Sequence, residues 1–122
     1  MKKTVILVFS AIILTGLIMG CATSRSGSLT RDAVLAYRNG DVDKFKSNMK
    51  EAHEIDPEDP YVLNNMGFIY EMEGKKAEAL SHYKEAAQKA GNRTVDVSQV
   101  REQEGRQLKD VATENYQRLE KK

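Results

Sequence analysis

Few side chains in this sequence could carry covalent or metal chemistry. It has one cysteine, Cys21, and two histidines, His53 and His82. The histidines fall on separate predicted helices without the paired spacing of a zinc site, so we expect both to be solvated surface residues. The sequence has no nucleophile elbow, no phosphate-binding glycine loop and no carboxylate pair with features that would shift its pKa values. These patterns argue against an enzyme, and we expect no metal, no small-molecule substrate and no cofactor.

The chemistry open to Cys21 depends on the segment before it. Residues 1–20 combine a basic start at Lys2 and Lys3 with an apolar run over residues 5–19. This run is shorter than the roughly 20 residues that a membrane-spanning helix needs. The pattern predicts a cleaved signal peptide over residues 1–20.

A cysteine directly after Gly20 resembles the lipobox of bacterial lipoproteins. The resemblance implies that Cys21 becomes the mature N-terminus and carries a diacylglycerol and an N-linked acyl chain such as palmitate. Ala22, in place of an aspartate, implies the outer membrane, with the protein facing the periplasm. The alternative is a signal-anchor helix in which the cysteine is incidental.

Without its signal, the chain has the size of one small domain. Loss of Lys2 and Lys3 leaves 17 basic and 18 acidic side chains, which argues against electrostatic capture of nucleic acid or of an anionic membrane surface. A lone cysteine allows no internal disulfide, so the domain must depend on a helical core. Residues 21–28 comprise the lipidated cysteine and a small, polar segment, which predicts a flexible tether that spans roughly 25 Å at most.

The rest of the chain is organised around residues 59–91, which predict two antiparallel helices. Asp59 can cap the first helix with Pro60 in its first turn, and Gly74 ends it. Apolar and small residues recur on one face of each helix at spacings of three and four, and we expect these faces to pack together. They form the predicted repeat core: Leu63, Met66, Gly67, Tyr70, Ala79, Tyr83 and Ala86.

The pattern L-x-x-M-G-x-x-Y followed by A-x-x-x-Y-x-x-A resembles a tetratricopeptide repeat. The resemblance implies helix pairs stacked in a right-handed α-solenoid and a protein or peptide partner. Gly91 replaces the proline that often leads into a further repeat.

Residues 29–58 predict an earlier, degenerate copy at an offset of 34 residues. Gly40 then aligns with Gly74, and Lys50-Glu51-Ala52 aligns with Lys84-Glu85-Ala86.

Beyond Gly91 the 34-residue alignment between repeats no longer holds. Residues 92–122 instead predict a loop, a capping box formed by Asp96 and Gln99, and a long C-terminal capping helix whose apolar stripe covers the last repeat. The predicted fold class is therefore all-α, with two such hairpins and a capping helix.

The face of the helix after Asp59 that turns away from the core is the predicted partner site. In the repeat family, the first helices of successive repeats line a groove that binds peptides. The alternative is that Tyr61 and Phe68 pack against the first repeat or the C-terminal helix. The predicted groove residues are Tyr61, Asn64, Asn65, Phe68 and Glu71, with Val34, Tyr37 and Arg38 from the first repeat.

These features predict a membrane-anchored interaction scaffold or assembly factor in the bacterial cell envelope, with a protein partner and without nucleic acid. One alternative is a structural lipoprotein that self-associates through its C-terminal helix. A second is a non-catalytic accessory subunit of a cell-wall enzyme.

Overall fold

The computed structural model describes residues 25–122, so the predicted signal peptide and Cys21 lie outside the described residues. Over this range the chain is all-α, as predicted. A helix over residues 25–38 is followed by α2 (Val42–Ile55), α3 (Pro60–Met72), α4 (Lys76–Lys89), the short 3-10 helix η1 (Arg101–Gln103) and α5 (Leu108–Glu120). None of the helices within residues 25–122 has both the length and the apolar character needed to cross a bilayer.

Two helical hairpins follow each other at the predicted offset of 34 residues, since α2 covers residues 42–55 and α4 covers residues 76–89. Each hairpin turns at a glycine in the left-handed region, Gly40 with φ 84° and Gly74 with φ 73°. Asp59 caps α3 by accepting the Tyr61 N–H at 2.8 Å, and Pro60 occupies the first turn. The predicted limits of this helix are confirmed.

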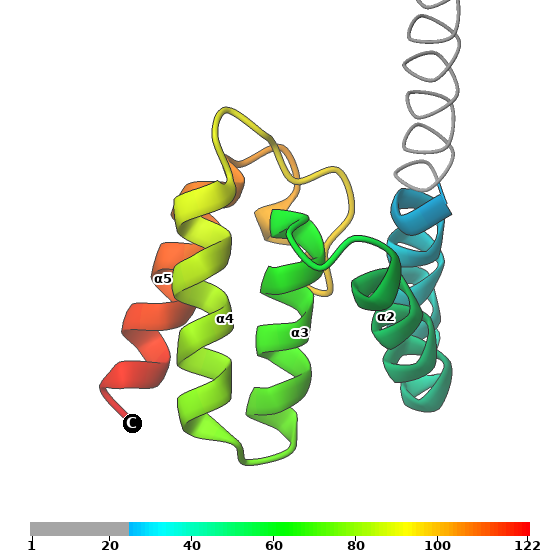
Figure 1. The fold of residues 1–122 in the computed structure, drawn as a ribbon, viewed down its shortest axis with the longest axis horizontal. Helices are drawn as coiled ribbons and strands as arrows, with labels where there is room; N and C mark the ends of the chain where they lie inside the picture. Colours follow the sequence, from blue (N-terminus) through cyan, green and yellow to red (C-terminus); the bar gives the residue numbers. More distant parts are fainter. Residues whose placement is uncertain (1–24) are drawn as a thin grey trace, which may run out of the picture.

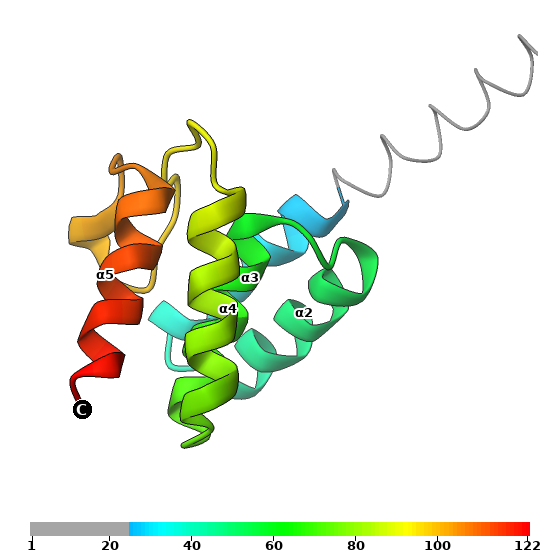
Figure 2. The same ribbon diagram turned by 60° about the vertical axis from the view of Figure 1, so that its left-hand side comes forward.

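The second repeat stacks on the first through the inward face of α3. Val62, Met66 and Ile69 join a buried cluster with Phe45, Met49 and Ala52 of α2. Figures 1 and 2 show α3 between the first hairpin and α4, with α5 on the far side of α4. The order of packing is that of a tetratricopeptide-like solenoid.

The helix α5 stacks on the second repeat in the same way. Ala112, Tyr116 and Leu119 have the same four-then-three spacing as Val62, Met66 and Ile69 of α3, and they pack with buried residues of α3 and α4. The α5 positions that correspond to the core residues Leu63, Gly67 and Tyr70 are polar. They are Thr113, Gln117 and Glu120. The helix α5 therefore covers the apolar end of the repeat pair with a polar outer face, which is the role of a capping helix.

Two predicted boundaries are wrong. Residues 25–28 are helical rather than part of a flexible tether, and the buried Ser26 hydroxyl donates to the Ala52 carbonyl at 3.3 Å. Residues 96–107 form a loop interrupted only by η1, not the start of a long helix. Here an isolated bridge between Thr94 and Gln107 closes the base of the loop, and main-chain hydrogen bonds between Val95 and residues 105–106 take the place of helical ones.

Candidate functional site

Most of the predicted repeat core lies where the two helices of the second repeat meet, whereas Met66 packs against the first repeat. Of these residues Leu63, Met66, Gly67, Ala79, Tyr83 and Ala86 are buried and Tyr70 is half-buried. The closest approach is at Gly67, where an added Cβ would lie 2.8 Å from carbon atoms of the Tyr83 ring. This core packs α3 against α4 and thereby determines which face of α3 points away from α4.

That opposite face is not the open groove that the sequence predicts. Asn64 and Asn65 are 7% and 5% exposed. The Asn115 side-chain amide of α5 donates to the Asn64 Oδ1 at 3.2 Å, and the Gln99 side-chain amide donates to the Asn65 Oδ1. The prediction of a free groove at these positions is wrong because the chain's own C-terminal part supplies their hydrogen-bond partners.

Glu71 is likewise held by the C-terminal part. The Arg118 guanidinium of α5 donates to both carboxylate oxygens at 2.6 and 2.7 Å, and the Tyr83 hydroxyl donates at 3.0 Å. Chiefly because of the Arg118 hydrogen bonds, the pKa of Glu71 falls to about 2. Burial, followed by the negative charge of Glu71, raises the pKa of Tyr83. Glu71 thus connects the two helices of the repeat to α5.

The predicted aromatic groove residues also pack inside the molecule. Phe68 is half-buried, and its ring centroid lies 5.3 Å from that of Tyr37 and 6.0 Å from that of Phe45, so it joins the two repeats. Tyr61 packs beside the buried cluster that includes Val95 and Leu108. The alternative noted from sequence, in which Tyr61 and Phe68 pack against neighbouring elements, describes their positions.

Residues 97–99, here named the groove-bound segment, lie across the first helices of both repeats. Val97 packs against the buried cluster of the first repeat. The Ser98 carbonyl accepts from the Arg38 Nε at 2.8 Å, and Gln99 reaches Asn65 of α3. Figure 1 shows the loop, in yellow to orange, passing from the end of α4 across the upper part of α3. The surface between the repeats therefore already binds a loop segment of this chain.

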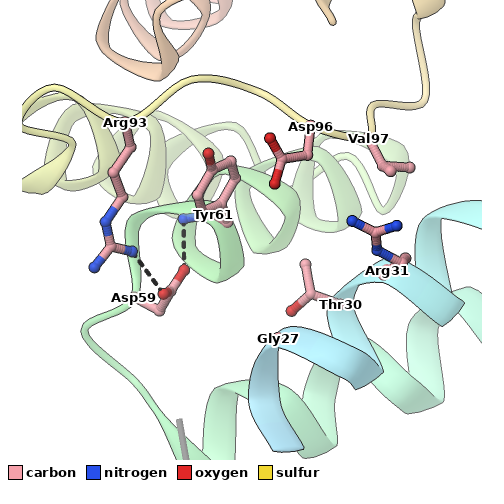
Figure 3. Close-up of a pocket in the computed structure, with 8 residues that line it drawn as sticks. All are labelled: Gly27, Thr30, Arg31, Asp59, Tyr61, Arg93, Asp96 and Val97. Carbon is pink, nitrogen blue, oxygen red and sulfur yellow. Dashed lines mark hydrogen bonds and ion pairs between the residues drawn. The ribbon is translucent and has the colours of Figure 1, made fainter. Parts of the chain in front are cut away.

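One end of this groove stays open as a pocket of about 330 Å³. It lies between the helix over residues 25–38, the start of α3 and the loop after α4 (Figure 3). The lining residues are Gly27, Thr30, Arg31, Asp59, Tyr61, Arg93, Asp96 and Val97. The pocket is mixed in character, with an aromatic ring, an aliphatic side chain, hydroxyl groups and charges of both signs.

The charged side chains of the pocket differ in whether they have hydrogen-bond or ion-pair partners within the fold. Asp59 accepts two main-chain N–H groups of α3 and the Arg93 guanidinium at 2.8 Å, so this pair is satisfied within the fold. The side chains of Arg31 and Asp96 have no hydrogen bond or ion pair to any other residue in the range 25–122. Burial, followed by the negative charge of Asp96, raises the pKa of Tyr61, which therefore keeps its proton and can donate.

Tyr61, a predicted groove residue, lines this pocket, but the sequence did not predict Thr30, Arg31, Arg93 or Asp96 as site residues. The sequence predicts a capping box at Asp96, whereas the residue lies in a loop at the pocket wall. The one local signal is the spacing of seven residues between Arg31 and Arg38, which places two guanidinium groups on the same face of a helix.

The two histidines come together although they lie on different helices. The His53 and His82 ring centroids are 5.9 Å apart, and both side chains are half-buried rather than fully solvated as expected. Burial, followed by the charge of His82, lowers the pKa of His53. Residues 25–122 contain no group of three or more potential metal ligands around this pair or elsewhere.

Comparison with known proteins adds a family match to this geometry. The family model described as "Tetratricopeptide repeat" matches residues 60–93. A curated relative, "Photosystem I assembly protein Ycf3" of Prochlorococcus marinus, is 39% identical over 54 residues, which cover 44% of this chain. The chain spans about a third of the length of that relative, since the match covers 31% of it. The comparison with solved structures gives no significant match. The family match and the helix pairs that recur every 34 residues together show that this chain contains a tetratricopeptide repeat.

Proposed function

We propose that this chain is a lipid-anchored scaffold or assembly factor of the bacterial cell envelope that binds a protein partner and catalyses no reaction itself. The observation that carries the proposal is the groove-bound segment, residues 97–99. Arg38 holds it through the Ser98 main-chain carbonyl, a group that any peptide offers, and Asn65 holds it through the side-chain amide of Gln99. The surface of the two repeats is thus suited to peptide binding, and the pocket is its open part.

The anchor in this proposal is Cys21. Its position after Gly20, at the end of an apolar run that follows two lysines, supports acylation and attachment to the outer membrane on the periplasmic side. Only Ala22, Thr23 and Ser24 separate it from the first described helix, so the domain would lie within roughly 15 Å of the bilayer. The domain would then bind its partner close to the membrane surface.

The assembly role draws support from the relative whose name describes an assembly protein. The match covers the repeat type and less than half of the chain, so it supports the class of function and not the machine that is assembled.

The proposal can be tested with a photo-crosslinking amino acid placed at Thr30, in the pocket, of the full chain in its native cells. We expect a discrete adduct with one protein other than the chain itself. The control is the same amino acid at Lys84, an exposed position on α4 outside the pocket. Adducts at both positions, at neither, or only between copies of this chain would contradict the proposal, and the last result would favour the self-associating alternative.

A further inference from the structure

The pocket continues the groove that holds residues 97–99. Arg31 and Arg38 are seven residues apart on one helix, and Tyr61 and Asn65 are four residues apart on α3. Each pair therefore shares a helix face. Arg38 and Asn65 bind the groove-bound segment, whereas Arg31 and Tyr61 face the pocket one to two turns away. The pocket thus has, like the site that binds residues 97–99 next to it, an arginine from the first helix and a polar side chain from α3.

The two charged side chains of the pocket that have no partner among residues 25–122 indicate what it could bind. Arg31 comes from the first helix and Asp96 from the loop after α4, and both are exposed. Figure 3 shows them on different walls of the pocket, with Tyr61 between Asp96 and the satisfied Asp59–Arg93 pair. Arg31 has the same guanidinium group with which Arg38 holds the Ser98 carbonyl and the Glu104 carboxylate. An anionic or carbonyl group at Arg31 and a cationic group at Asp96 would complement the pocket.

We propose that the pocket binds an extended peptide segment of the protein partner, with an acidic side chain placed on Arg31 and a basic side chain placed on Asp96. This inference rests on the proposed function and names the chemistry of the partner. The guanidinium of Arg31 can bind a carboxylate through two parallel hydrogen bonds. The Tyr61 ring and the Val97 side chain offer apolar contact to the stems of the bound side chains. A volume of about 330 Å³ is at the lower end for ligand pockets, and it suits side chains rather than a folded element.

The test measures binding of short capped peptides to the purified full chain by calorimetry. The peptides carry one glutamate and one lysine, either adjacent or separated by one or two alanines. We expect one spacing to bind best and to lose about tenfold in affinity when glutamate is replaced by glutamine or lysine by glutamine, since each loses a charge-assisted hydrogen bond. The affinity should also fall with added salt.

Charge reversal distinguishes the pocket from nonspecific attraction. Arg31→Glu should weaken binding of the preferred peptide about tenfold and should favour a peptide in which lysine replaces the glutamate. Lys84→Glu is the matched control, with the same charge change at an exposed site on α4, and should bind as the wild type does.

Three results would overturn the inference: equal binding of charged and neutral peptides, unchanged binding by Arg31→Glu, or binding of free amino acids while all capped peptides fail. Each of these can occur while cross-linking at Thr30 in cells still finds a partner. The proposed function and the proposed peptide chemistry can therefore fail separately.

Discussion

Gly67 is the residue on which the packing of the second repeat depends most directly. Its missing side chain lets α3 approach the Tyr83 ring of α4, and the phenol hydroxyl of Tyr83 then reaches Glu71 one turn further along α3. The same glycine thus determines both the helix contact and the polar connection to α5.

Replacing Gly67 should reveal this approach. Gly67→Ala would place its Cβ 2.8 Å from ring atoms of Tyr83, so we expect a loss of about 1 to 3 kcal/mol in the free energy of unfolding. The matched control is Gly27→Ala, in the first helix, where nothing lies within 4 Å of an added Cβ. That change should stabilise the helix by about 0.5 to 1 kcal/mol. Thermal unfolding of both variants checks the prediction, and an unchanged Tm for Gly67→Ala would contradict it.

Glu71 should make the stability of the protein depend on pH. Its pKa lies near 2 in the folded protein against an ordinary value of 4.5 for a glutamate side chain, so its stabilising effect is complete above pH 4.5 and disappears as the pH falls from there to about 2. We expect Glu71→Gln to cost about 1 to 3 kcal/mol at pH 7 and to make stability less dependent on acid. Denaturant titrations at several pH values would measure this.

The control for that experiment is Glu114→Gln. Glu114 also pairs with an arginine, Arg106, but its side chain is 57% exposed. Solvent screening should therefore leave the stability of this variant close to that of the wild type. Parallel acid profiles for the wild type and Glu71→Gln would show that the Arg118 contacts contribute nothing.

At the scale of elements, α5 determines where the repeat pair ends. Leu119 packs with Ala79 and Tyr83, whereas Gln117 is exposed on the opposite side of the same helix. We expect Leu119→Ala to lower the free energy of unfolding by about 2 to 4 kcal/mol, because it opens a cavity at the end of the core. Gln117→Ala is the control and should change it by less than about 0.5 kcal/mol. If denaturation midpoints show equal losses, α5 is not the capping element described.

The groove-bound segment is the second element that can be tested. Arg38→Gln removes the guanidinium that holds the Ser98 carbonyl and Glu104, so the loop should open more often. Trypsin cleavage after Arg101, in η1, should then become about tenfold faster. Arg31→Gln changes the same type of residue on the same helix, where the side chain makes no hydrogen bond to residues 97–99, and its cleavage rate should match the wild type. Equal rates for the two variants would show that Arg38 does not hold the segment.

At the scale of the whole molecule, the lipid anchor proposed at Cys21 can be tested by mutation. We expect Cys21→Ser to abolish acylation and to release the exported protein from the membrane fraction, because two or more acyl chains, each worth about 0.8 kcal/mol per buried methylene, would be lost. Fractionation followed by mass spectrometry measures both effects. Thr23→Ser, two positions away, is the control and should stay membrane-bound. A Cys21→Ser protein that remains in washed membranes would contradict the lipid anchor.

The sequence by itself determined the helix pairs. The cap at Asp59, the turns at Gly40 and Gly74 and the spacing of small and apolar residues all act within one or two helical turns, so local patterns could predict them. The offset of 34 residues then followed from comparing one stretch with the next.

Only the tertiary structure decided what covers the groove. Arg38 meets Ser98 across 60 positions and Asn64 meets Asn115 across 51, and these polar residues have no periodic pattern that would mark them as partners. A buried asparagine needs a hydrogen-bond partner, but its type does not say from which part of the chain the partner comes. Packing of Val97 and Leu108 fixes the path of the loop, and that path leaves Arg31 and Asp96 on the walls of the pocket.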